Sequence, residues 1–256
     1  MPVLERLLLR ERPIVLVGLC GVIVLSWLYL VPASLDMYGA MDGLSAWMMQ
    51  THWDVRYFVL VFLMWAVMMV GMMLPSAAPA ILLYARVQRT SAGVEAPTLR
   101  IQAFTAGYLL AWTGFSLAAT LLQYALSRAA LLSPMWESAS PVLGAVLLVN
   151  AGLYQLTPFK QSCLSRCRSP AGFFMQHWRP GVRGALRLGV RHGLYCVGCC
   201  WALMLLLFVG GVMSLLWIGA ITVFVLIEKL APLGVQGGRL SGALLALAGI
   251  VLLASA

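Results

Sequence analysis

The sequence predicts an all-α protein, a polytopic bundle of about seven transmembrane helices in one domain covering residues 1–256. Two observations predict this class. The chain is 62% hydrophobic and only 10% charged, whereas soluble domains average about 45–50% apolar and about 25% charged residues. The apolar runs are near-continuous, about 20 residues long and without two-residue alternation. Lipid cannot satisfy backbone polar groups, so such runs must pair those groups within helices.

Seven apolar runs follow one another along the chain. The predicted spans cover residues 13–32, 55–75, 101–126, 141–158, 186–209, 213–230 and 240–255. The first run is too long for a secretory signal peptide and lacks a clear cleavage site, so we expect a retained helix. Gly210 and Gly211 leave a very short link between the fifth and sixth spans, which predicts a tight antiparallel hairpin.

The distribution of charge predicts the orientation of these spans. When the N-terminus is placed inside and the spans alternate, all but two of the 17 Lys and Arg residues fall inside; Arg56 and Arg128 are the exceptions. Basic residues concentrate on the cytoplasmic side of membrane proteins. We therefore expect an N-in, C-out protein of the inner (cytoplasmic) membrane, whose basic excess meets anionic lipid rather than nucleic acid.

A cysteine-rich stretch, HGLYCVGCCW, occupies residues 192–201 in the fifth predicted span. At about 100° per residue, four potential ligands share one helix face: His192, Cys196, Cys199 and Cys200. Thiolate and imidazole are preferred ligands of Cu(I) and Zn(II), so this face is a candidate metal site. Buried cysteines also pack as small hydrophobes, and that interpretation stays open.

One helix rarely closes a metal site, so we expect a second element to contribute ligands. Cys163 and Cys167 lie on the same predicted side of the membrane, with a C-x3-C spacing found in metal loops. The second span carries two i+4 rows of methionine: Met64, Met68 and Met72 in one, and Met69 and Met73 in the other. Thioethers suit Cu(I), although methionine also fills gaps in a core. The predicted metal ligands are Cys196, Cys199, Cys200, His192, Cys163, Cys167, Met68 and Met72.

A redox function is the main alternative. Cys196 and Cys199 have the C-x-x-C spacing that supports thiol–disulfide exchange. Membrane disulfide carriers usually need thiols on the oxidising side, whereas this cluster maps to the inner, reducing side. Topology therefore favours metal binding without a catalytic role. A membrane thiol oxidoreductase and a non-catalytic accessory subunit of a larger complex remain alternatives.

Two charged residues end the sixth predicted span. Glu228 and Lys229 have side chains long enough to extend to the inner interface. Polar side chains within a span are functional candidates by default; the alternative for these two is that they snorkel to the interface with no further role.

Three stretches resemble a family of bacterial integral membrane proteins of unknown function that are predicted to bind metal. They are MWAVMMVGMMLPSAAPAILLYARV, NAGLYQLTPFKQSCLSRCRSP and RHGLYCVGCCWALMLLLFVGGVMSLLW, the last continuing to IEKL. The resemblance covers about residues 55–230. It implies that the motif cysteines are Cys163, Cys167, Cys196, Cys199 and Cys200, and it implies no established reaction.

These observations together predict Cu(I) handling, with Zn(II) as the other candidate ion. Copper collected at the cysteines would pass to the methionine rows, whose thioethers bind it more weakly. The sequence has no phosphate-cradling nucleotide loop, so any transport would be passive, ion-coupled or driven by a partner. The expected partners are the lipid bilayer and either a metallochaperone or a membrane metalloenzyme that is loaded with metal.

Overall fold

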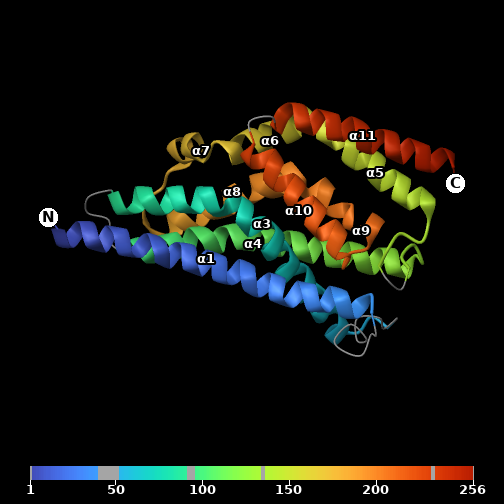
Figure 1. Cartoon of the computed structure of the whole chain (residues 1–256), viewed down its shortest axis with the longest axis horizontal. Helices are drawn as coiled ribbons and strands as arrows, with labels where there is room; N and C mark the ends of the chain where they lie inside the picture. Colours follow the sequence, from blue (N-terminus) through green and yellow to red (C-terminus); the bar gives the residue numbers. More distant parts are fainter. Residues whose placement is uncertain (1, 40–51, 91–95, 134–135, 232–233, 256) are drawn as a thin grey trace.

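The computed structural model describes residues 2–39, 52–90, 96–133, 136–231 and 234–255. Every named element of these residues is a helix, which confirms the predicted all-α class. The helices are α1 (Pro2–Met37), α3 (Val55–Thr90), α4 (Pro97–Arg128), α5 (Pro141–Leu156), α6 (Pro158–Arg168), α7 (Pro170–His177), α8 (Gly181–Leu205), α9 (Leu207–Gly210), α10 (Leu215–Leu230) and α11 (Gly234–Ala254). The N- and C-termini lie at opposite ends of the elongated bundle (Figure 1).

Several helices have the length and apolar composition expected of a membrane protein. Among the described residues, five segments are long and apolar enough to cross a bilayer: Val15–Met37, Val55–Arg89, Pro97–Arg128, Gly181–Gly210 and Gln236–Ala254. Helices α5 and α6 make a sixth candidate if they count as one span, bent by 66°. Helix α10 has 16 residues, fewer than the roughly 20 that usually span a bilayer. The predicted total of about seven spans stays a prediction.

The break between α5 and α6 has a local cause. Pro158 lacks a backbone N–H and disfavours a helical conformation in the preceding residue. That residue, Thr157, has an extended backbone, and its hydroxyl accepts from the N–H of Lys160 and so caps α6. The predicted span 141–158 therefore ends two residues early, and α6 turns away with its two cysteines.

Helix α3 continues to Thr90 through Pro75 and Pro79, beyond the predicted end of the second span at residue 75. A proline inside a helix leaves the carbonyl four residues earlier without its usual donor. For Pro75 this carbonyl belongs to Gly71, and the indole Nε1 of Trp27 on α1 donates to it at 3.3 Å. Neighbouring helices thus satisfy the backbone that proline frees, as is common in membrane helices.

Glycines allow the backbones of α4 and α8 to approach closely. A Cβ atom at Gly107 would overlap the carbonyl oxygen of Leu186, and one at Gly189 would overlap that of Phe104. Small residues at such crossings permit tight packing between helices in lipid. This crossing fixes the position of α8 against α4.

The helices differ in how far they are enclosed by protein. In α3 and in the segment Gly181–Gly210, 56% of the most apolar window is buried, compared with 17% in α1 and in α11. The central helices α3 and α8 therefore hold the interior of the bundle. The outer helices leave apolar side chains such as Leu25 and Ile250 exposed, as suits contact with lipid.

Candidate functional site

Helix α8 directs its three cysteines into the interior of the bundle. Cys196, Cys199 and Cys200 are each at most 2% exposed. The thiols of Cys199 and Cys200 both donate to the carbonyl oxygen of Cys196, at 3.1 and 3.0 Å. The three thiols therefore lie together on the buried face of one helical turn.

Helix α6 brings the other pair of cysteines to the same turn. The Sγ atoms of Cys167 and Cys199 lie 4.0 Å apart. Cys163 is buried, and its Sγ lies 3.0 Å from the position that a Cβ atom at Gly198 would occupy. The absence of a side chain at Gly198 therefore lets α6 approach α8. On the other side, Tyr154 of α5 donates its hydroxyl to the Gly198 carbonyl.

Helix α3 contributes a methionine to the cysteine group. The Sδ of Met73 lies 3.9 Å from the Sγ of Cys200. Met68 and Met72, the predicted ligands, are fully buried on the same helix, but the measured sulfur contact comes from the neighbouring i+4 row. The roles of Met68 and Met72 stay predictions.

Two residues that the sequence did not single out as ligands surround Cys196. The Nζ of Lys229 donates to the Sγ of Cys196 at 2.9 Å and to the Oγ of Ser76 at 3.0 Å. The hydroxyl of Tyr108 lies 3.1 Å from the same Sγ and donates to the Met73 carbonyl at 3.1 Å. Helices α4, α8 and α10 thus meet at one sulfur atom, and α3 contacts the lysine and the tyrosine that surround it.

Of the two interpretations of Glu228 and Lys229, the one in which they snorkel to the interface is wrong. Both are buried, and Glu228 pairs with Lys160 of α6. The physical reason is that α10 packs against α3, so its last turn points inward. The sequence could have indicated this burial. Lys229 follows Val225 by four residues, and residues four apart lie on the same face of a helix, here the face that α10 buries.

His192 lies one turn before Cys196 on α8, and it sits among aromatic rings. It is 3% exposed, and its Nδ1 has no hydrogen-bond partner. Its ring centroid is 5.4 Å from that of Phe173 and 6.0 Å from those of Phe104 and Tyr108. The hydrogen bonds and sulfur contacts described for the thiols do not include His192, so its role as a ligand stays a prediction.

The geometry suits pairs of sulfur ligands better than a larger cage. In the part of the chain that the structure describes, no group of three or more His, Cys, Asp or Glu side chains is arranged to hold a metal ion. With metal–sulfur bonds of about 2.3 Å, two sulfurs on one ion stand about 3.8 Å apart in tetrahedral geometry and about 4.6 Å apart in linear geometry. The separations for Cys167–Cys199 and Cys200–Met73, 4.0 and 3.9 Å, fall within this range.

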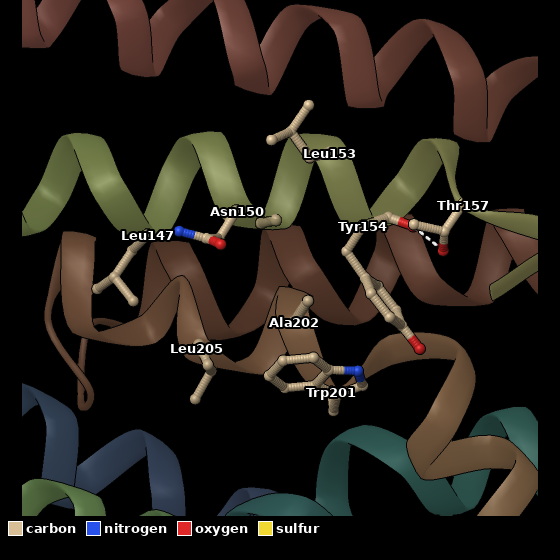
Figure 2. A pocket seen from close by; sticks show the side chains of 9 residues that line it. Leu147, Asn150, Leu153, Tyr154, Thr157, Trp201, Ala202 and Leu205 are labelled. Atoms are coloured by element: carbon tan, nitrogen blue, oxygen red, sulfur yellow. Dashed lines mark hydrogen bonds between the residues drawn. The ribbon is translucent and has the colours of Figure 1, made fainter. Parts of the chain in front are cut away.

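A surface pocket beside α8 has a different character. It lies between α5 and α8, has a volume of about 220 Å³, and is lined by nine residues that include neither cysteine nor histidine. Figure 2 shows Tyr154 and Trp201 close together at this pocket; their ring centroids are 5.1 Å apart. The pocket offers no sulfur ligand, so we place the candidate site at the buried cysteines.

Comparison with known proteins gives one result. Residues 62–252 match the PpoB2 family model, which is described as a copper chaperone. No curated protein and no solved structure matches the chain. The matched range contains each of the sulfur, lysine and tyrosine residues described above.

Proposed function

The chain belongs to the PpoB2 family, described as a copper chaperone, and from this premise we propose that it binds and passes on Cu(I) within the membrane. The observation that carries the proposal is the convergence of sulfur atoms from three helices, all of them buried except Cys167, which is half-buried. Cys167 of α6 meets Cys199 of α8, and Cys200 of α8 meets Met73 of α3.

The number and type of ligands favour Cu(I) over Zn(II). Structural zinc sites are almost always four-coordinate, with cysteine, histidine or carboxylate ligands. Sulfur in pairs, one of them including a thioether, matches the preference of the softer Cu(I) ion. The proposed ligands are therefore the thiols of α6 and α8 together with Met73.

A route for copper leads from the cysteines into α3. Met73 contacts Cys200 and stands one helical turn from Met69, about 6 Å along the helix. Met68 and Met72 continue the buried methionine surface of α3. Because thioether is a weaker ligand than thiolate, these positions would let the ion leave. Receipt from a metallochaperone and delivery to a membrane metalloenzyme are the steps that such a route would serve.

The test is the metal content of the full chain. The protein would be purified in detergent, under reducing conditions, from cells supplied with copper and zinc. We expect copper near one ion per chain in the wild type and its loss in a Cys199→Ser/Cys200→Ser double variant, which removes one thiol from each sulfur pair. Cys20→Ser is the matched control, because Cys20 is exposed on α1.

The competing outcomes are distinct. Copper that survives in the double variant would contradict the proposed ligands. A metal-free wild type that forms a reversible Cys167–Cys199 disulfide would favour a thiol oxidoreductase instead.

A further inference from the structure

Lys229 is a buried cation whose hydrogen-bond partners are a thiol and a hydroxyl rather than a carboxylate. Its Nζ contacts Cys196 and Ser76. The adjacent carboxylate, Glu228, is instead paired with Lys160 of α6. The positive charge of Lys229 therefore faces the sulfur site.

A buried charge is strongly unfavourable unless a counter-charge accompanies it. The contacts of Lys229 leave a thiolate as the available counter-charge, since Ser76 is neutral. Metal binding to sulfur requires cysteines in this same anionic form. The lysine and the bound ion thus balance the same negative charges.

We propose that Lys229 is a specificity-determining residue that makes the sulfur site favour a monovalent ion over a divalent one. This inference rests on the proposed copper function. At the Cys200–Met73 pair the ion has one thiolate ligand, Cys200, and the neighbouring Cys196 carries the second negative charge beside Lys229. Lys229 and Cu(I) supply two positive charges, so the loaded site is neutral. The same site with Zn(II) retains one net positive charge. In a low-dielectric interior such an unbalanced charge is costly.

The first test replaces the charge of Lys229. A Lys229→Met variant keeps an unbranched chain without the ammonium, and Lys229→Arg keeps the charge. Purified full-length proteins would be loaded in lipid nanodiscs from a mixture of Cu(I) and Zn(II), and their metal content measured. We expect the bound copper-to-zinc ratio to fall about tenfold or more in Lys229→Met, and to fall much less in Lys229→Arg.

A second pair of variants leaves the lysine in place. Ser76 Oγ lies 3.0 Å from Lys229 Nζ, so Ser76→Asp would neutralise the ammonium from the other side. Ser76→Asn is the matched control, because it has nearly the same shape without charge. We expect the copper-to-zinc ratio to fall in Ser76→Asp and to stay near the wild-type value in Ser76→Asn. This pair keeps the test decisive if Lys229→Met does not fold.

The outcomes separate the inference from the proposed function. A copper-loaded wild type with an unchanged ratio in Lys229→Met, or in Ser76→Asp if the lysine variant does not fold, overturns the role of Lys229 alone. Equal loss of both metals in the charge-changing variant also overturns it, because the lysine would then only support the structure. A wild type that binds neither ion overturns the proposed function and this inference with it.

Discussion

The two buried lysines of the bundle, Lys160 and Lys229, have different partners. Lys160 is paired with the carboxylate of Glu228, and this ion pair fastens α6 to α10. Lys229, the next residue after Glu228 on α10, turns to the thiol of Cys196 instead. The charge of Lys160 is neutralised by a carboxylate of the protein. The charge of Lys229 is neutralised only when Cys196 is a thiolate. The partner of a buried lysine, rather than its burial, thus separates a structural from a functional role.

The largest expected effect comes from breaking the balanced pair. A Lys160→Met variant leaves Glu228 buried without its cation, so we expect it to be less stable by about 3–5 kcal/mol. The double variant Lys160→Met/Glu228→Gln removes both charges and should recover most of that loss. Denaturant unfolding in detergent measures both. If Lys160→Met were as stable as the double variant, the Lys160–Glu228 ion pair would not hold α6 against α10.

The Lys160→Met/Glu228→Gln variant also tests whether metal preference depends on Lys229 in particular. Because the Lys160–Glu228 pair is neutral as a whole, its removal should leave the copper-to-zinc ratio near the wild-type value. A large shift in that ratio would mean that distant charges, and not Lys229 in particular, set metal preference.

A smaller effect is expected where α6 approaches α8. A Gly198→Ala variant places a Cβ atom 3.0 Å from Cys163 Sγ, so we expect α6 to give way by a few tenths of an ångström, at a cost of about 1–3 kcal/mol relative to the control below. The shift should also weaken copper retention, because Cys167 moves with α6. Gly219→Ala is the matched control, since no heavy atom lies within 4 Å of a Cβ there. Equal copper content and stability in the two variants would exclude a tight α6–α8 contact.

The smallest loss of stability is expected on substitution of Tyr108, the uncharged side chain that contacts Cys196. Tyr108→Phe removes a hydroxyl that contacts Cys196 Sγ and the Met73 carbonyl, at a cost of about 0.5–1.5 kcal/mol. The copper-to-zinc ratio should not change, because the tyrosine side chain is uncharged. A shift as large as that of Lys229→Met would mean that hydrogen bonding, rather than charge, governs preference.

Much of the site follows from local periodicity, and the rest depends on packing. The shared face of Cys196, Cys199 and Cys200 is a property of one helix, so the spacing alone predicts it. The contact of Met73 with Cys200 depends on how α3 is rotated against α8, which a single helix cannot specify. The position of Tyr108 depends on the glycine crossing of α4 and α8.

The ends of the helices also divide into those that local sequence predicts and those that depend on packing. Pro158 marks the break after α5 in the sequence, although the predicted span ran through it. The continuation of α3 past Pro75 could not be predicted, because the donor to the freed Gly71 carbonyl is Trp27 on another helix. The inward turn of Lys229 likewise depends on α10 lying against α3.

The most direct measurement is X-ray absorption at the copper edge on the loaded, full-length protein. The sulfur convergence predicts reduced Cu(I) with a first shell of two or three sulfur atoms at about 2.3 Å. It further predicts that this shell is lost in the Cys199→Ser/Cys200→Ser variant, which removes one thiol from each sulfur pair, and kept in Cys20→Ser. A first shell of oxygen or nitrogen atoms, or a spectrum unchanged by the double substitution, would contradict copper binding at the buried cysteines.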